Sequence, residues 1–345
     1  MQFIKPDINI DFIGKRRIAY GVSALLILLT VVTLFWHRGP RYGIDFAGGT
    51  VIQVQFQEAV DIETVKQGIA EAGLGRATVQ RFGQVDDHEY LIRSDLADNP
   101  DQLSEQLVEI LGRLTGAAAE VQRVEMVGPQ VGKDLQRKAL QAIFYSLLFI
   151  AIYISGRFEQ RWTIAAVIAA ALIGAVYGLS LLDLSMPWLI LAGVVVTLVL
   201  FWFLQLRYAM GAIVALIHDV GITVGVFSLM EKEFTLPIIA ALLTIIGYSL
   251  NDTIIVFDRI RENLRHHPRR LLEETVNRSI NETLSRTILT SGTTLIVVLA
   301  LTLLGGGIIH DFAFALLIGI LVGTYSSIFV ASPILLLWQG RARRT

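Results

Sequence analysis

Long apolar runs alternate with short polar segments over most of the chain. Runs of about 17–25 apolar residues are long enough to cross a bilayer as helices. The pattern therefore predicts a polytopic α-helical membrane protein of about eight spans. They cover residues 18–36, 138–155, 163–182, 186–205, 209–230, 236–257, 286–304 and 309–338. The last run is too long for one straight span, so we expect it to tilt or to end in the interface.

The first run is predicted to be an uncleaved anchor. It follows three basic residues, Lys15 to Arg17, as a signal peptide would. Its apolar stretch is longer than the hydrophobic region of a signal peptide, and it ends at Phe35 and Trp36 without a small-residue cleavage site. We expect residues 1–17 to precede a permanent first helix over 18–36.

Residues 37–137 carry the pattern of a small globular domain instead. Val51–Gln57 alternates strictly between apolar and polar residues, which is typical of a half-buried strand. Further strands are expected at 78–82, 89–93 and 121–127, with helices at 61–72 and 100–114. The order β-α-β-β-α-β is the ferredoxin-like arrangement. No nucleophile, metal cluster or phosphate-binding loop is evident, so we expect a binding or lever module and not an enzyme.

Composition and charge distribution narrow the class further. Of the 345 residues, 54% are hydrophobic, only 17% are charged and none is cysteine, which excludes a soluble domain and a disulfide scaffold. Seventeen Lys and Arg lie in short segments that would share one side of the membrane, against Lys232 alone on the other. Positive charge marks the cytoplasmic side. We therefore expect both termini, the tail 339–345 and the connection 258–285 in the cytoplasm, and residues 37–137 outside it.

An internal repeat falls within the predicted bundle of residues 138–338. Arg161–Ala169 resembles Arg207–Ala215 at an offset of 46 residues, and each copy follows an aromatic-rich apolar helix. The interpretation is an extra helical hairpin over about 163–207, which returns the chain to the same side. Chance similarity among Ala, Ile and Val strings remains an alternative.

Ionisable residues inside spans are costly and mark candidate functional sites. Asp252 lies near the cytoplasmic end of its predicted span, flanked by Ser249, Asn251 and Thr253, which could solvate a proton or water. Arg286 stands at the start of the next span, at a similar depth. The two could form a pair that breaks when Asp252 is protonated. A fixed helix–helix hydrogen bond for Asp252 and a snorkelling role for Arg286 remain alternatives.

A second candidate is His218-Asp219, in the middle of its predicted span. A proton relay and a buried structural pair are both compatible with this placement. Two residues are too few for a metal site, so no metal or other cofactor is expected.

Two further polar segments suggest structural roles. Asp45, Gly48 and Gly49 precede the first strand, where they could form a tight turn as the domain leaves the membrane, with Asp45 accepting from nearby amides. The connection 258–285 carries Leu272, Val276, Ile280 and Leu284 at a spacing of four, which predicts an amphipathic helix on an anionic membrane surface.

These motifs resemble the SecD/SecF family, and within it the SecF branch, of the resistance-nodulation-division superfamily. The resemblance covers nearly the whole chain apart from about 163–207, where this chain departs from the usual six spans. The matching segments are Gly43–Thr50, Val127–Gly132, Ala215–Asp219, Gly247–Thr253, Val256–Asn263 and Ser285–Thr294. By motif, the family's membrane Asp and Arg fall on Asp252 and Arg286.

The resemblance implies an accessory subunit of bacterial protein export in the inner membrane. It implies a heterodimer with SecD beside the SecYEG channel, with SecA acting indirectly and YajC and YidC as further partners. The pair would use the proton motive force to promote late translocation of preproteins through movements of its outer domains. No role with nucleic acid is expected. The alternative is a stand-alone exporter of small molecules or lipids from the same superfamily, although such exporters carry a repeated core and two outer domains.

Overall fold

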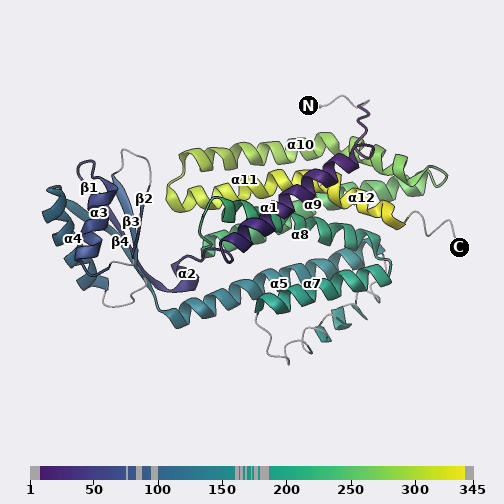
Figure 1. Ribbon diagram of the computed structural model, residues 1–345. Coiled ribbons are helices and arrows are strands. Elements are labelled where there is room, and N and C mark those ends of the chain that lie inside the picture. Colours follow the sequence, from purple (N-terminus) through teal and green to yellow (C-terminus); the bar gives the residue numbers. More distant parts are fainter. Residues whose placement is uncertain are drawn as a thin grey trace.

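The computed structural model describes residues 8–74, 77–82, 88–94, 100–159 and 186–338, with scattered positions between 163 and 178. A bundle of long helices carries a small α+β domain at one end (Figure 1). The bundle contains α1 (Arg16–Trp36), α5 (Pro129–Glu159), α7 (Met186–Phe203), α8 (Arg207–Leu229), α9 (Leu236–His266), α10 (Leu272–Leu304) and α11 (Gly307–Ser326). The start of α1 and the tip of the α9–α10 hairpin lie at the end away from the domain (Figure 1).

In the part of the chain that the structure describes, six helices are long and apolar enough to cross a membrane, and they coincide with six of the predicted spans. They are Arg16–Trp36, Pro129–Phe158, Arg207–Leu229, Leu236–His266, Leu272–Leu304 and Ile309–Leu337. The predicted span 186–205 forms the shorter apolar helix α7. The predicted span 163–182 lies largely outside the described residues, so the number of spans stays a prediction.

The last predicted span is helical throughout but changes its helix type along its length. After α11 the chain enters a π-helical turn, η2 (Ser327–Ala331), followed by α12 (Ser332–Ile334) and the 3₁₀ turn η3 (Leu335–Trp338). π turns inside helices are frequent near functional sites, and this turn begins at the last of four consecutive polar residues, 324–327.

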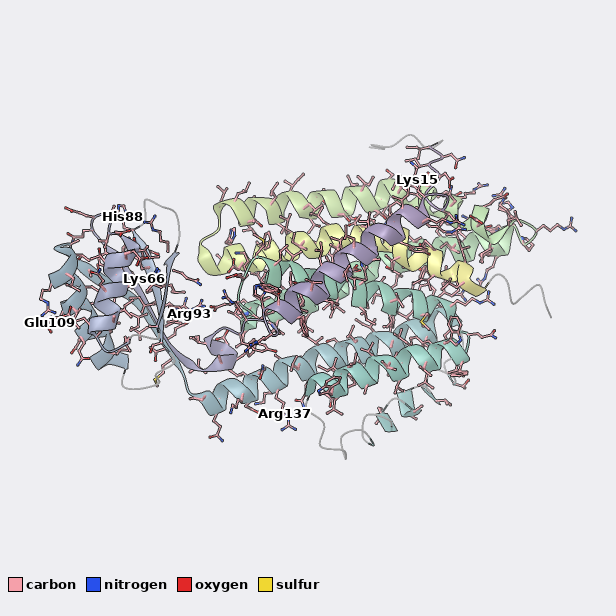
Figure 2. All side chains as sticks on the ribbon, in the orientation of Figure 1. Lys15, Lys66, His88, Arg93, Glu109 and Arg137 are labelled. Atoms are coloured by element: carbon pink, nitrogen blue, oxygen red, sulfur yellow. The ribbon has the colours of Figure 1, made fainter. Side chains whose placement is uncertain are left out.

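The domain consists of β1 (Gly49–Phe56), α3 (Ile62–Glu71), β2 (Thr78–Phe82), β3 (Glu89–Ser94), α4 (Pro100–Thr115) and β4 (Ala119–Val127). The strands form an antiparallel sheet in the order β2-β3-β1-β4. Both helices pack on one face, where Val54, Ile92, Val65 and Leu107 are almost fully buried. The other sheet face is turned toward the helical bundle, and Arg93 lies on that side (Figure 2).

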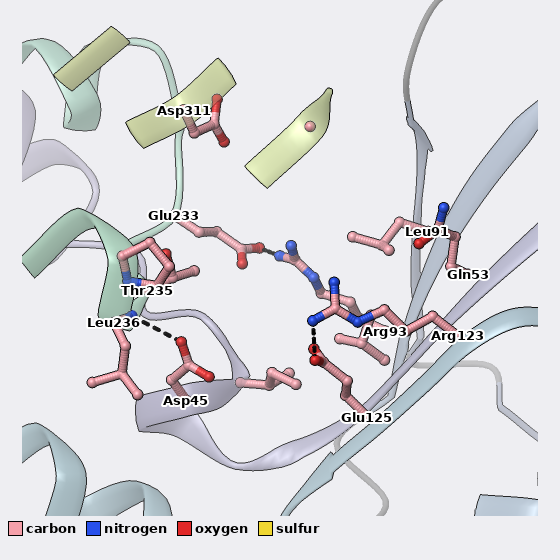
Figure 3. A pocket seen from close by; sticks show the side chains of 14 residues that line it. Asp45, Gln53, Leu91, Arg93, Arg123, Glu125, Glu233, Thr235, Leu236 and Asp311 are labelled. Carbon is pink, nitrogen blue, oxygen red and sulfur yellow. Dashed lines mark hydrogen bonds and ion pairs between the residues drawn. The ribbon is translucent and has the colours of Figure 1, made fainter. Parts of the chain in front are cut away.

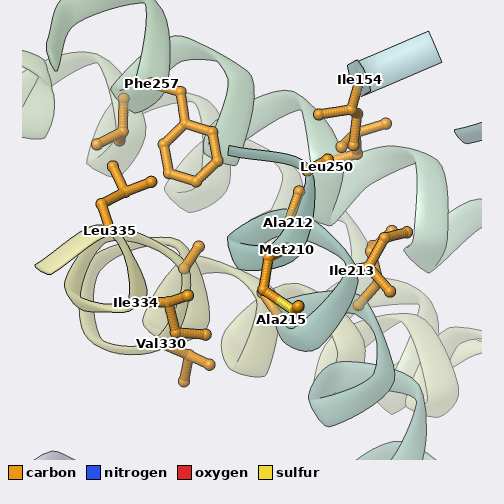
Figure 4. Close-up of a cluster of buried hydrophobic side chains, with 14 of the residues drawn as sticks. Ile154, Met210, Ala212, Ile213, Ala215, Leu250, Phe257, Val330, Ile334 and Leu335 are labelled. Atoms are coloured by element: carbon orange, nitrogen blue, oxygen red, sulfur yellow. The ribbon is translucent and has the colours of Figure 1, made fainter. Parts of the chain in front are cut away.

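The core of the bundle is formed by α5, α8, α9 and the segment after α11. Phe257 of α9, Ile154 of α5, Ala212 of α8 and Leu335 of η3 are buried together (Figure 4). The helix α7 packs against α5 and α8. The described half of the predicted hairpin therefore packs beside these helices, and Phe201 of α7 is fully buried in the same core.

The connection between the predicted spans at 257 and 286 is a helical hairpin, because α9 continues to His266 and α10 begins at Leu272. The two helices are in contact there, and the Asn263 amide of α9 donates to Ser279 Oγ of α10 at 3.0 Å. The prediction that its apolar stripe lies on a membrane surface is wrong, because Val276 and Ile280 are fully buried in the main core. A surface helix and a helix packed on its neighbour share the same apolar period.

Candidate functional site

The two residues His218 and Asp219 lie in the interior, on α8. Asp219 is fully buried, and its Oδ1 lies 2.9 Å from His218 Nδ1. Its Oδ2 accepts from Ser249 Oγ of α9 at 2.5 Å and from Ser326 Oγ of α11 at 2.7 Å. Both oxygens of this carboxylate therefore have partners, as the burial of a polar group requires.

The other ring nitrogen of His218 faces α1. His218 Nε2 lies 3.0 Å from Ser23 Oγ, and Ser23 Oγ lies 3.1 Å from the hydroxyl of Tyr325. Tyr325 belongs to α11 and donates to the carbonyl oxygen of Ala19 at 2.7 Å. The rings of His218 and Tyr325 are stacked, with centroids 6.1 Å apart. A row of polar contacts thus joins α8, α1 and α11.

Asp252 lies on α9 one turn beyond Ser249 and contacts a different pair of helices. Its carboxyl is buried and accepts from Ser291 Oγ of α10 at 3.1 Å. Ser291 in turn accepts from Thr324 of α11 at 2.8 Å. The consecutive residues Thr324, Tyr325 and Ser326 therefore each contact a different part of the network. We call this set, with Ser23, His218, Asp219, Ser249, Asp252 and Ser291, the polar layer.

The predicted companions of Asp252 are distributed differently from the expectation. Ser249 hydrogen-bonds to Asp219 and not to Asp252. Asn251 is exposed on the bundle surface, and Thr253 is buried. The spacing of three to four residues that places Ser249 and Asp252 on one side of a helix does not decide which neighbouring helix each meets.

Arg286 of α10 is exposed and close enough for a Coulombic interaction with the Asp252 carboxyl. Among the described residues it forms no ion pair in this arrangement of the helices. The predicted Asp252–Arg286 pair is thus open here. Within the described part of the chain, no group of three or more His, Asp or Glu is arranged to hold a metal ion.

The sequence analysis assigned no functional role to Ser23 or Ser291. The signal that could have found the remaining members was the polar run Thr324 to Ser327, the longest inside the last span. Contacts between α1 and α11 join residues more than 300 positions apart, which a single sequence does not reveal.

Asp45, Gly48 and Gly49 occupy the neck, which we define as residues 41–49 together with the α8–α9 connection, residues 230–236. The neck contains the short helix α2 (Ile44–Ala47) instead of a simple turn. Asp45 Oδ2 accepts from the amide of Leu236 at the start of α9, at 2.8 Å. Its partner is therefore an amide nearly 200 residues away. Gly48 has a φ of +79°, and a Cβ there would lie 2.8 Å from Pro129 Cα at the start of α5.

Main-chain hydrogen bonds also join residues 41–43 to the α8–α9 connection. The Phe234 amide donates to the Arg41 carbonyl at 2.8 Å, and the Gly43 amide donates to the Phe234 carbonyl at 2.8 Å. The side chain of Arg41 pairs with Glu231 at 2.8 Å. The connection that joins the two carboxylate-bearing helices is thus bound by the segment that leads into the domain.

Charged side chains complete the neck around a cavity of about 270 Å³ between the sheet and the helix ends (Figure 3). Arg93 of β3 reaches across it to form an ion pair with Glu233. Lys232 pairs with Asp311 of α11 at 2.5 Å. Burial lowers the pKa of the Arg93 guanidinium, and the nearby Asp311 carboxylate offsets part of that shift. An arginine nevertheless stays charged at neutral pH.

Comparison with known proteins identifies the family. A family model described as "Protein export membrane protein SecD/SecF, C-terminal" matches residues 108–182 and 169–341, and the "SecD/SecF GG Motif" matches residues 33–60. The two segments of the first match overlap at 169–182, within the predicted insertion. A protein translocase subunit SecF of Magnetococcus marinus is 42% identical over the whole chain and 96% of its own length. One of Vibrio alginolyticus is 39% identical over 97% of this chain and 91% of its own.

A solved structure supports the same assignment. The crystal structure of SecDF, a translocon-associated membrane protein from Thermus thermophilus, aligns with a TM-score of 0.72 and 34% identity. The alignment covers 98% of this chain and 40% of that one, so the chain spans less than half of the SecDF polypeptide. These similarities extend over the polar layer, the neck and the domain alike. The chain therefore belongs to the SecF family of protein translocase subunits.

Proposed function

We propose that this multi-pass inner membrane protein couples proton movement to a late step of protein export, together with SecD. The observation that carries the proposal is the pair of buried carboxylates, Asp219 and Asp252, within one polar layer of membrane-crossing helices. Asp252, Arg286, Asp219 and His218 are the proposed coupling residues, with Ser249, Asn251 and Thr253 around them. Hydroxyl groups both donate and accept, so they stabilise a carboxyl in either protonation state.

The proposed orientation places both termini in the cytoplasm and residues 37–137 outside it. It is supported by the position of the start of α1 and of the α9–α10 tip at one end of the bundle, opposite the domain (Figure 1). The described arginines at that end include Arg157, Arg259 and Arg278. The domain, with the arrangement expected of a ferredoxin-like module, would move outside the membrane and act on the translocating preprotein.

The proposed partners are SecD, the SecYEG channel and, indirectly, SecA, with YajC and YidC as further associates. SecD association is supported by the solved SecDF chain, of which this chain aligns with 40%. A half-core that needs a second half is less compatible with a stand-alone exporter. Coupling to protons rather than to sodium ions is part of the proposal.

The test replaces Asp252 with Asn in inverted membrane vesicles that contain this chain and its partner. We expect Asp252→Asn to abolish the stimulation of preprotein export by a proton gradient while assembly persists. The matched control is Asp258→Asn, six residues further along α9, where the carboxylate is partly exposed and pairs with Arg157 at 2.7 Å. Normal gradient-dependent export by the Asp252→Asn protein would refute the proton role.

A further inference from the structure

Four successive polar contacts lead from Asp219 to the backbone of α1. They join Asp219 Oδ1 to His218 Nδ1, His218 Nε2 to Ser23 Oγ, Ser23 Oγ to the Tyr325 hydroxyl, and that hydroxyl to the Ala19 carbonyl oxygen. Their lengths are 2.9, 3.0, 3.1 and 2.7 Å. Each lies within hydrogen-bond distance, so each requires one hydrogen between its two heavy atoms.

The donors of this row can be counted. A carbonyl oxygen carries no hydrogen, so Tyr325 donates its single hydroxyl hydrogen to Ala19. Ser23 must then donate its own to Tyr325, and His218 Nε2 must carry a hydrogen and donate it to Ser23. The remaining contact needs another hydrogen, either on His218 Nδ1 or on Asp219 Oδ1.

We infer that His218 and Asp219 together hold two protons in this structure, one more than a neutral imidazole beside a carboxylate. The structure thus assigns a proton-binding site to this pair, in its loaded state. The two serine hydroxyls that donate to Asp219 Oδ2 favour the form with the carboxylate ionised and the imidazole doubly protonated.

The surroundings of the pair are consistent with this count. Within the described chain, α1, α9 and α11 present hydroxyls to it, and no lysine, arginine or second carboxylate forms an ion pair with it. His218 is 4% exposed, and Asp219 is fully buried. The extra proton on the pair therefore balances the carboxylate charge without a cationic side chain from elsewhere.

Release of this proton has a structural consequence at Tyr325. When Nε2 gives up its proton to water, it becomes an acceptor, and Ser23 must turn its hydrogen toward His218. Tyr325 has one hydroxyl hydrogen and can then donate it either to Ser23 or to the Ala19 carbonyl, so one of these two contacts between α11 and α1 is lost. Tyr325, two residues before the π turn, is therefore a positioning residue whose contact between α11 and α1 depends on the proton content of the pair.

The inference deepens the proposed function and rests on it for a role in transport, but the proton count rests on hydrogen-bond geometry alone. Its test is nitrogen NMR on the purified full-length chain with ¹⁵N-labelled histidine at pH 7, with the signals of His218 identified by their loss in His218→Gln. We expect Nε2 to carry a proton. A neutral ring with its proton on Nδ1 and a bare Nε2 would overturn the inference.

Variants of the row provide a second measurement. Tyr325→Phe removes the acceptor of the Ser23 hydrogen and frees Ser23 to donate to His218 Nε2, so the signal of a protonated Nε2 at pH 7 should be reduced or lost. Ser23→Ala removes the acceptor of the Nε2 proton and should weaken the same signal. The matched control is Tyr248→Phe, a tyrosine that bonds within the α9–α10 pair at 3.2 Å. An unchanged signal of protonated Nε2 in both row variants would contradict the inference.

The two proposals fail separately. A bare Nε2 would refute the two-proton state of His218 and Asp219, but it would not affect the vesicle result for Asp252. Normal export by the Asp252→Asn protein would refute the coupling function, whereas the histidine spectrum would still be evidence for the proton count.

Discussion

The polar layer inside the bundle and the neck beneath the sheet both contain carboxylates, but these carboxylates have different partners. In the polar layer, Asp219 and Asp252 are held by serine hydroxyls and one imidazole. In the neck, Glu231, Glu233 and Asp311 are held by arginines and a lysine. An arginine only donates and keeps its charge, whereas a hydroxyl accepts as readily as it donates. The layer can therefore change its proton content, whereas the arginine and lysine pairs of the neck keep their charge over the neutral pH range. Two histidines, His37 and His310, also lie 3.8 and 3.9 Å from Glu231 and Asp311.

The largest effect on folding stability is expected from removing a carboxylate of the polar layer. Asp219→Ala leaves His218, Ser249 and Ser326 without their acceptor, and loss of one member of a buried charged pair costs about 3–5 kcal/mol of folding free energy. Unfolding in detergent by denaturant measures the change. The control Asp134→Asn removes an exposed pair with Lys138 on α5 and should cost less than about 1 kcal/mol. Equal losses in the two proteins would show that the layer is not required for stability.

The second largest effect is expected at Gly48, where a substitution tests whether close backbone contact stabilises the neck as much as its ion pairs do. Gly48→Ala adds a Cβ at a positive φ and against Pro129, so strain and overpacking together should cost roughly 2–4 kcal/mol. Gly73→Ala is the matched control, because Gly73 has nearly the same φ, +77°, but open space around its Cα. Its cost should be limited to about 1–2 kcal/mol. Thermal unfolding of the two variants compares them, and a Gly48→Ala protein no less stable than the control would contradict the close contact.

The smallest effect is expected from the ion pair across the cavity. Arg93→Gln should weaken the neck by about 1–2 kcal/mol, since charged hydrogen bonds contribute on that scale. Faster hydrogen exchange of the Phe234 and Gly43 amides would measure it, and added salt should narrow the difference from the unchanged protein. The charge-reversed double variant Arg93→Glu/Glu233→Arg should recover the slow exchange.

Arg113→Gln is the control for that experiment, because Arg113 pairs with Glu71 between the two helices of the domain itself. It should leave exchange at the neck unchanged. Fast exchange in this variant, or slow exchange in Arg93→Gln, would show that the Arg93–Glu233 pair does not hold the domain in place.

The elements of the domain could be predicted from the sequence because each depends on a local period. The strand at 78–82 was predicted with the bounds that it has, and β1 begins two residues before its predicted start. Membrane spans were predicted equally well where apolar length decided them. The π turn after Ser326 was not predicted, because it replaces one helical geometry by another with the same apolar composition.

The residues of the polar layer were predicted only in part. Asp219 and Asp252 stand out because a charge inside a span is costly, but Ser23, Tyr325 and Ser326 are ordinary residues in apolar helices. Their importance comes from the packing of α1 and α11 against α8, which depends on the whole bundle. For the same reason the sequence placed Ser249 beside Asp252, while the helix packing turns it toward Asp219.

The neck is connected directly to the Asp252 carboxylate in the interior of the bundle through the helix α9. Residues 41–45 bind the connection whose two ends are the end of α8 and the start of α9. A helix is stiff along its axis. The part of α9 from Leu236 to Asp252 spans roughly 24 Å at about 1.5 Å per residue. The domain therefore holds the start of the helix that carries Asp252. A tilt of the domain at this joint would be transmitted to Asp252 along a single helix.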